Sequence, residues 1–334
     1  MSQKRRKARK RRKQARESAK SFFLWLLLIV IAIAGLVVVN EKWLRCQYIP
    51  TTSDIAELIG FEKRPKVIVE QDEISVHFID VGQGDCVLID TPEKDMLIDC
   101  GEEEYAGKVI MYLRKYGVTK LDYIIASHPH SDHMGGMSRI MTAFEAGEFI
   151  MPDVPDDMIP QLEFYADAMN VITAKGISLT YSEIGRSISL CEGTQLEIIG
   201  PIGTDYSDLN SYSIIAKLIS GNRSFLFTGD MEKDAEYVMA GSWLSDLSAD
   251  VIKVPHHGSA SSSSMDFVIR VHPEYAVFSV GDDNKYGHPN SEVIAFYRSI
   301  GCKTLLTMHC GDIVFITDGN DIRYVTANGE IKAA

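Results

Sequence analysis

Three histidines and one aspartate lie within six residues of one another in the segment Ser127–Gly136, which reads SHPHSDHMGG. His128 and His130 alternate along an extended segment, so both side chains can point to the same side, whereas Asp132 and His133 are adjacent and diverge. One turn can therefore present two ligands to each of two metal positions. Imidazole and carboxylate together suit Zn²⁺, Mn²⁺ or Fe, and the segment predicts a metal site.

Four further motifs combine histidine, carboxylate, glycine and serine beside strand-like runs. They are Phe78–Asp85 (FIDVGQGD), Phe227–Asp230 (FTGD), Val254–Ser259 (VPHHGS) and Asn284–Pro289 (NKYGHP). The whole chain holds only nine histidines. Their concentration in these motifs therefore favours shared chemistry over a chance grouping in surface loops.

Taken in order, the five motifs resemble the metallo-β-lactamase superfamily, and more closely the soluble hydrolase domain attached to the ComEC-type competence DNA-uptake channel and its stand-alone relatives. The resemblance covers roughly residues 74–334. It implies an α/β fold, the αββα metallo-β-lactamase sandwich, with two divalent metal ions, Zn²⁺ or Mn²⁺, at one edge between the sheets. It also implies a metal-dependent hydrolase that uses a metal-bridging hydroxide.

The resemblance also assigns metal ligands: His128 and His130 to the first metal, Asp132 and His133 to the second, and Asp230 as the bridge, while His256, His257 and His288 compete as the last ligand of the second metal. The superfamily usually supplies one more histidine to the first metal, but this chain has none from Met134 to Pro255. An Asn/Ser stretch, Leu209–Ser213, stands in that place. Either Asn210 or water then completes the first metal.

The C-terminal histidines leave two assignments open. His256 directly follows a strand and is the favoured ligand, with His257 facing the substrate, while His288 is the alternative ligand. The expected catalytic residues are Asp132, His257 and His288, and the expected substrate-binding residues are Asn210, Ser211, Ser259, Asn284 and Tyr286. Asp80 and Asp85 are expected to organise their loop or to orient the histidines.

A phosphodiester is the favoured substrate, because two metals bind the non-bridging oxygens and the motif residues could donate to the phosphate. A nuclease is the narrower form of this hypothesis, and charge opposes it. Residues 21–334 hold 23 basic and 45 acidic residues, a formal charge of −22, which repels a polyanion outside local basic patches. No cluster of Lys and Arg with interleaved aromatic residues occurs between 72 and 334.

Two alternatives therefore stay open. One is a hydrolase of a small substrate that is not a nucleic acid, such as an envelope phosphodiester, a lactone or a β-lactam. The other is a non-catalytic binding module of the same fold, which the missing first-metal histidine favours. Five retained polar ligands oppose the second alternative, because around an empty site they would repel one another or lie unsatisfied.

The elements that must position these motifs are short apolar runs rich in Val and Ile, bounded by Gly, Pro and Asp, which predict strands. Predicted helices cover Gly107–Tyr116, Gly136–Ala146, Gln161–Lys175, Glu232–Ala240, Ser264–Val271 and Ser291–Ile300. Strands and helices are mixed in two successive halves, which predicts two sheets between helical layers.

Ahead of these elements, Phe22–Val39 forms an uncharged run of eighteen residues, about the length of a membrane-spanning helix. Residues 1–20 hold eleven Lys and Arg, which predicts a cytoplasmic N-terminus. The predicted organisation is a basic cytoplasmic tail (1–20), a transmembrane helix (21–40), a stalk (41–71) and an extracytoplasmic hydrolase domain (72–334). The bilayer, contacted by residues 22–39, is the expected partner, and a single span provides no DNA channel.

The six cysteines form no CxxC pair, which argues against a zinc ribbon or a thioredoxin-like motif. A hairpin centred on Glu93 would place Cys86 opposite Cys100, close enough for a disulfide, as an oxidising compartment would allow. Two buried thiols in a core strand pair are the alternative.

Overall fold

The structure is a computed structural model that describes residues 70, 72–242, 244, 246–282, 284–327 and 331–333, together with five positions nearer the N-terminus. The chain divides into two compact units, Met1–Lys63 and Arg64–Ala334. All described residues other than those five positions belong to the second unit.

The predicted membrane span is described at only five helical positions, Trp25, Ile31, Ala32, Gly35 and Leu36. The rest of that span, the predicted tail and the predicted stalk apart from Glu70 lie outside the described residues. Among the described residues, no helix combines the length and the apolar character needed to cross a membrane.

The larger of two β-sheets has nine strands among the described residues, in the spatial order β16-β15-β14-β1-β2-β3-β4-β5-β6. Their bounds are β1 (Ile74–Phe78), β2 (Val87–Asp90), β3 (Asp95–Ile98), β4 (Lys120–Ile125), β5 (Glu145–Met151), β6 (Ser178–Tyr181), β14 (Ile313–Thr317), β15 (Ile322–Thr326) and β16 (Ile331–Ala333). Strands β3 to β6 run parallel to one another, and the remaining neighbours are antiparallel.

The smaller sheet has seven strands in the order β13-β12-β11-β10-β9-β8-β7. Their bounds are β7 (Ser187–Cys191), β8 (Thr194–Gly200), β9 (Ile215–Ser220), β10 (Arg223–Phe227), β11 (Val251–Lys253), β12 (Tyr275–Phe278) and β13 (Lys303–Leu306). Strands β10 to β13 are parallel. Each sheet therefore contains a parallel block whose carboxyl ends share one edge.

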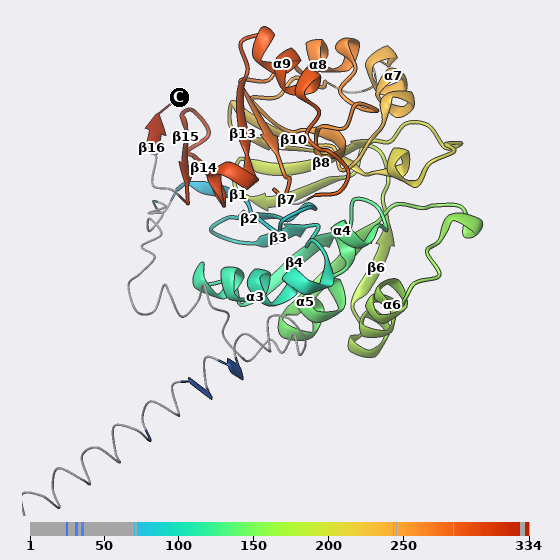
Figure 1. The fold of residues 1–334 in the computed structure, drawn as a ribbon, viewed down its shortest axis with the longest axis vertical. Helices are drawn as coiled ribbons and strands as arrows, with labels where there is room; N and C mark the ends of the chain where they lie inside the picture. The colour runs from blue at the N-terminus through green and yellow to red at the C-terminus, as the bar shows by residue number, and fades with distance from the viewer. Residues whose placement is uncertain are drawn as a thin grey trace, which may run out of the picture. The chain divides into compact units, whose positions relative to one another are not determined.

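Helices cover the outer face of each sheet, as Figure 1 shows, with α3, α5 and α6 on the larger sheet and α7, α8 and α9 on the smaller one. The α-helices are α3 (Ala106–Lys115), α4 (Ser131–Met134), α5 (Met137–Ala143), α6 (Glu163–Lys175), α7 (Lys233–Gly241), α8 (Met265–Val271), α9 (Ser291–Ser299) and α10 (Thr307–Cys310). Short 3₁₀ turns are η2 (Glu103–Tyr105), η3 (Asp156–Met158), η4 (Leu209–Tyr212) and η5 (Pro255–Gly258). The predicted αββα sandwich is confirmed.

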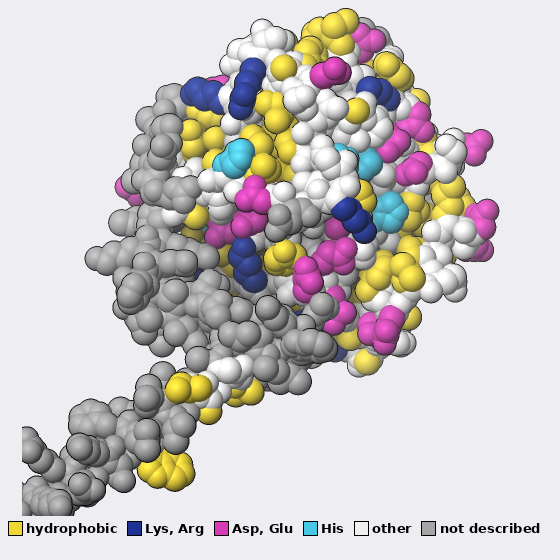
Figure 2. All heavy atoms as spheres, in the orientation of Figure 1, with side chains coloured by type: hydrophobic (Ala, Val, Ile, Leu, Met, Phe, Trp, Pro, Cys, Tyr) yellow, Lys and Arg dark blue, Asp and Glu magenta, His cyan; other side chains and the backbone are white. Residues whose placement is uncertain are grey.

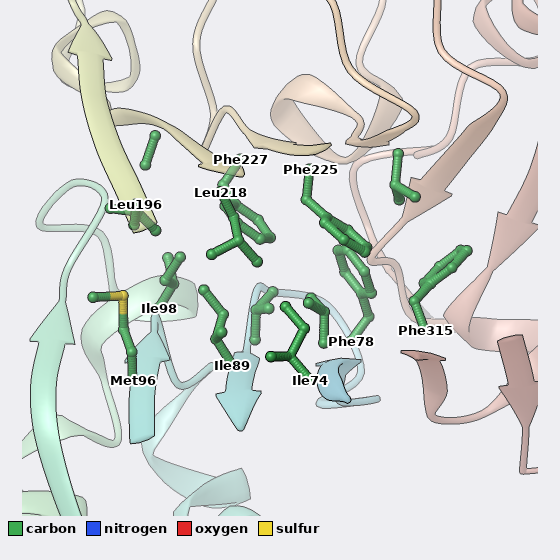
Figure 3. Packing of buried hydrophobic residues seen from close by; sticks show 14 of the residues in the cluster. Ile74, Phe78, Ile89, Met96, Ile98, Leu196, Leu218, Phe225, Phe227 and Phe315 are labelled. Carbon is green, nitrogen blue, oxygen red and sulfur yellow. The ribbon is translucent and has the colours of Figure 1, made fainter. Parts of the chain in front are cut away.

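Alternation along the strands builds three apolar layers. In β10, Phe225 and Phe227 face the space between the sheets, while Leu226 packs under the outer helices. In β2, Ile89 faces inward and Leu88 faces the helices on the other side. Figure 3 shows side chains from both sheets pointing toward one another in the central layer. This packing fixes the register of both sheets, because a slip of one residue would exchange the two faces of a strand.

The β2–β3 hairpin differs from its predicted register. Val87 pairs with Ile98, and Asp90 pairs with Asp95, so the loop has four residues rather than the five expected. The shift of one residue moves Cys86 out of the position opposite Cys100. Both are buried, and all five described cysteines are free thiols, so the predicted disulfide is wrong and the alternative of two buried thiols holds.

Candidate metal centre

Polar side chains follow the carboxyl ends of strands from both sheets. His128 follows β4 of the larger sheet, Asp230 follows β10 of the smaller sheet, and His257 follows the neighbouring β11. Because β10 and β11 are parallel, their last residues meet at one edge. The long loop motifs of the two sheets are thereby brought together, as the sequence predicted.

Four residues form the centre of this group: Asp132, His133, Asp230 and His257 each offer one ligand atom, and these atoms all lie within 4.8 Å of one another. Oδ2 of Asp230 is 3.2 Å from Nε2 of His133 and 3.3 Å from Nε2 of His257. Oδ2 of Asp132 is 3.4 Å from the same His257 atom. Two imidazoles and two carboxylates converging in this way make a donor set suited to a divalent metal.

Hydrogen bonds on the far side of each ring set its orientation. Nδ1 of His133 donates to Oδ2 of Asp99 at 2.9 Å, and Nδ1 of His257 donates to the carbonyl oxygen of Ser279 at 2.7 Å. With Nδ1 as the donor, Nε2 carries the lone pair that a metal needs. Both Nε2 atoms are buried without a hydrogen-bond partner. These unsatisfied atoms fit a metal ion at the centre of the group.

The electrostatics of the cluster also favour a cation. Burial alone would lower the pKa of His257, but the carboxylates of Asp230 and Asp132 together outweigh this effect and raise the pKa to about 9. Burial likewise opposes protonation of His133, yet the carboxylates of Asp230, Asp132 and Asp99 raise its pKa well above the ordinary value. The carboxylates thus stabilise positive charge at the point where the histidine Nε2 atoms meet.

His128 and His130 lie beside this cluster, with Nε2 of His128 only 2.9 Å from Nδ1 of His130. The Oγ atoms of Ser127 and Ser213 lie 3.1 and 3.3 Å from Nδ1 of His128 and hold its ring. Asn210 is buried, its Oδ1 has no hydrogen-bond partner, and it lines the same cleft as His130. Two imidazoles and an amide oxygen are therefore available for the first metal.

The paired histidines of the VPHHGS motif exchange the places that we expected for them. His257 joins the cluster, whereas Nδ1 of His256 is 3.2 Å from Oε1 of Glu232 and its Nε2 is 3.8 Å from Oδ2 of Asp230. The reason is backbone conformation: both residues have positive φ, 46° and 53°. The resulting turn directs the second ring inward, to the carbonyl of Ser279, and leaves the first at the cleft.

A close backbone approach at Gly84 joins the FIDVGQGD loop to the first motif. The N–H of Asp85 donates to the carbonyl oxygen of Asp132 at 3.1 Å. Gly84 has φ +137°, and a Cβ there would lie 2.3 Å from the same carbonyl oxygen. Only glycine fits this position, which explains the second glycine of the motif.

The cluster lies at the base of a cleft of about 330 Å³. The residues lining it are Gln83, Pro129, His130, Ser131, Asp132, Pro160, Leu162, Phe164, Asn210, Asp230, His256, His257, Tyr286 and His288. These described lining residues include neither Lys nor Arg. Figure 2 shows histidine side chains reaching the surface on the face drawn, with acidic side chains nearby. Among these lining residues only the histidines could carry positive charge toward an anionic group, while Nζ of Lys285 lies 5.2 Å from the ring centroid of Tyr286.

His288 and Tyr286 form one wall of the cleft, with ring centroids 5.8 Å apart and nearly parallel planes. Tyr286 is exposed. Nδ1 of His288 is buried without a hydrogen-bond partner. Burial, together with neighbouring His256 and His257, lowers the pKa of His288 to about 4, so its ring is neutral at physiological pH.

Three predicted substrate-binding residues are instead bonded within the loops. Ser211 donates to Oδ1 of Asp234, Ser259 Oγ lies 2.8 Å from Ser261 Oγ, and Asn284 bonds the backbone of His288. They are absent from the described residues that line the cleft, whereas Asn210 and Tyr286 are present. These three residues therefore stabilise the loops around the cleft.

Two charged residues at the site were missed by the sequence analysis. Asp99, directly after β3, accepts from His133 and from the N–H and hydroxyl of Ser127. Lys253 ends β11 and is buried, with its Nζ 2.5 Å from Oδ2 of Asp85. A charged residue at the end of a buried apolar strand was the available signal in both cases.

Comparison with known proteins gives a family match. A family model described as the metallo-beta-lactamase superfamily matches residues 79–282. The metallo-beta-lactamase fold protein YhfI from Bacillus subtilis aligns with a TM-score of 0.50 and 10% sequence identity, over 73% of this chain and all of that protein. The structural likeness therefore extends to the fold.

Curated relatives cover most of this chain. Competence protein ComA from Neisseria gonorrhoeae is 30% identical over 259 residues, which are 77% of this chain and 34% of the relative. ComE operon protein 3 from Bacillus subtilis (strain 168) is 25% identical over 265 residues, 73% of this chain and 33% of the relative. The chain thus spans about a third of the length of these relatives, and the predicted resemblance is confirmed.

Proposed function

Because this chain belongs to the metallo-beta-lactamase superfamily, we propose that it is a membrane-anchored, metal-dependent phosphodiesterase whose hydrolase domain lies outside the cytoplasm. A nuclease is the narrower form of this activity. The fold is one of metal-dependent hydrolases, and the described residues include the cluster that such chemistry requires.

One observation carries the catalytic part: the buried Nε2 atoms of His133 and His257 converge on the carboxylates of Asp132 and Asp230, all within 4.8 Å of one another. A binding module without metal would have to keep two imidazoles and two carboxylates buried together only as an ion-pair network, whose desolvation costs free energy. Asp132, His133, Asp230 and His257 would hold one metal, His128, His130 and Asn210 would hold the other, and Asp230 is the expected shared carboxylate.

Bound divalent metals would polarise a phosphoryl oxygen and lower the pKa of water. The side chains of the protein would position the substrate and transfer protons. Asp132 is partly exposed in the cleft, where its carboxylate can accept a proton from the attacking water. His256 and neutral His288 line the same cleft with ring centroids 5.3 Å apart and can contact the leaving oxygen. Tyr286 can hold the remainder of the substrate against the cleft wall.

The choice of a phosphodiester is supported by the resemblance to competence proteins and by the name of the Neisseria relative. The cleft itself supports a second candidate. Its described lining has no Lys or Arg, which suits a small ester with little charge better than a long polyanion. A hydrolase of small envelope phosphodiesters or lactones is therefore the competing function.

The catalytic test uses the full chain in detergent, stripped with chelator and then supplied with Mn²⁺ or Zn²⁺. We expect hydrolysis of bis(p-nitrophenyl) phosphate only with metal, and a loss of at least about 100-fold in kcat in Asp132→Asn. Asp318→Asn, which alters an exposed carboxylate that accepts from backbone N–H groups of its own turn between β14 and β15, is the matched control. Bound metal with no turnover of phosphodiesters or lactones would favour the non-catalytic binding module.

The membrane part is supported by the uncharged run 22–39 and by the eleven basic residues before it. Basic residues are retained on the cytoplasmic side of a span. A reporter enzyme that is active only outside the cytoplasm, fused after Ala334, should be active. Activity of a cytoplasm-only reporter at that position would contradict the proposed orientation.

A further inference from the structure

Lys253 is a buried cation beside the candidate metal centre. It ends β11, where Val251 and Ile252 pack into the two apolar layers on either side of the smaller sheet. Its side chain is 2% exposed. A lysine is rarely buried to this extent unless its charge is paired, so its partners indicate its purpose.

Three oxygen atoms surround the ammonium group. Nζ of Lys253 lies 2.5 Å from Oδ2 of Asp85, 2.9 Å from the carbonyl oxygen of Gly229 and 3.4 Å from Oδ1 of Asp230. An ammonium group has three N–H donors, and each has an acceptor here. The group is therefore fixed by the FIDVGQGD loop on one side and by the FTGD turn on the other.

The two carboxylate oxygens of Asp230 consequently face different partners. Oδ1 faces Lys253, while Oδ2 lies 3.2 Å from Nε2 of His133, 3.3 Å from Nε2 of His257 and 3.8 Å from Nε2 of His256. Three imidazoles thus approach one oxygen, and the cation holds the other. This arrangement requires the Asp230 carboxylate to stay in one orientation.

We propose that Lys253 is a positioning residue, which holds Oδ1 of Asp230 and so presents Oδ2 alone to the metal centre. This inference rests on the proposed function, because it concerns how the centre is built. Lys253 also pairs with Asp85, whose Oδ1 is buried without a hydrogen-bond partner and lies 3.5 Å from Nδ1 of His257. Lys253 therefore pairs with two carboxylates, and a test must separate the effects of the two pairs.

The first arm measures the melting temperature of the full chain without metal. Lys253→Met removes the charge at similar size and leaves the buried carboxylate of Asp85 without its cation and Oδ1 of Asp230 without its donor, so we expect a fall on the order of 10 °C. The matched control is Lys217→Met, because Lys217 is also buried, on β9 of the same sheet, and pairs with Asp246 at 2.8 Å. The control should melt close to the wild type, because Asp246 is exposed.

Two double variants then separate the partners. In Lys253→Met with Asp85→Asn, the unpaired Asp85 charge is gone, and the melting temperature should largely recover. Lys253→Met and Asp230→Asn should be non-additive, because their side chains contact each other. Additive effects of the latter pair would show that Lys253 does not hold Asp230, and would overturn the inference even in a chain that binds no metal.

The second arm measures the dissociation constants of Mn²⁺ and Zn²⁺ by calorimetry on the folded variants. We expect Lys253→Met to weaken binding about 10- to 100-fold, as for other residues that orient a ligand, and the double variant with Asp85→Asn to remain weak although it is stable. Equal or tighter binding, or recovery in that double variant, would overturn the positioning role. A wild-type chain without metal affinity would instead defeat the proposed function.

Discussion

Buried histidines occur in two opposite environments in this chain. His257 faces carboxylates, which raise its pKa to about 9 against the effect of burial. His77 lies in β1 between the hydroxyls of Ser75 and Tyr112, at 2.8 and 2.9 Å. Burial lowers the pKa of His77 to about 3. Neighbouring charge, rather than burial alone, therefore decides which histidines can serve a cationic centre.

His77 should make the fold sensitive to acid. Its pKa is about 3 in the folded chain and about 6.5 in an unfolded one. The unfolded state therefore binds the proton first, and stability that is present above pH 6.5 is lost as the pH falls toward 3. Between pH 7.5 and pH 5, the wild type should lose about 2 kcal/mol more free energy of unfolding than His77→Gln.

Urea unfolding of both proteins at the two pH values measures this difference, and the other titrating groups cancel because both chains share them. An equal loss in the two proteins would show that His77 is not kept neutral in the folded chain.

Single residues of the site could be predicted from sequence where a motif concentrates them, as for His133 and Asp230, which the cluster contains. The order of His256 and His257 could not, because it depends on two consecutive positive φ values. Lys253 was missed because its partner Asp85 is 168 positions away in the sequence and joins it only after both sheets have formed.

At the scale of elements, the site depends on how closely the loops approach. Gly84→Ala should force apart the FIDVGQGD loop and the Asp132 segment, because the new Cβ would lie 2.3 Å from a backbone oxygen. A displacement of about 1 Å at a catalytic group can lower kcat on the order of 100-fold. Turnover of bis(p-nitrophenyl) phosphate by the metal-loaded chain measures the loss.

Gly117→Ala is the control for that change. Gly117 also has positive φ, +84°, but no atom lies within 4 Å of its added Cβ. The Gly117→Ala variant therefore has only the backbone strain, about 1 kcal/mol, and should keep the wild-type kcat. Equal kcat in both variants would contradict the role of the close approach at Gly84.

Helices were predictable to within a few residues, since their apolar periodicity is local: the prediction Ser291–Ile300 compares with α9, Ser291–Ser299. Most strands were predictable for the same reason, although the predicted helix Gly136–Ala146 runs into β5, Glu145–Met151. The register of β2 and β3 was not, because one residue in the turn decides it, and that residue, Asp95, begins the strand and pairs with Asp90. When the residues on both sides of a turn are apolar, the sequence alone does not favour the four-residue loop over the five-residue loop.

At the scale of the whole molecule, charge separates the two ends of the chain. Residues 1–20 carry eleven Lys and Arg, while residues 21–334 carry a formal charge of −22. Acidic side chains are prominent on the face drawn in Figure 2. A net negative body slows the approach of a polyanion, and dissolved salt screens that repulsion.

Salt should therefore separate the two candidate substrate classes. The test uses proteoliposomes with the hydrolase domain outward and the basic tail enclosed. Cleavage of an oligothymidylate should accelerate as NaCl rises from about 20 to about 200 mM, because the Debye length falls from about 20 to about 7 Å over this range. Proteins that bind nucleic acid through basic grooves show the opposite trend, because salt weakens their phosphate contacts. Hydrolysis of the small monoanion bis(p-nitrophenyl) phosphate should change little under the same conditions. Oligothymidylate cleavage that slows with salt would mean that a basic path to the cleft exists and that the acidic body does not govern access.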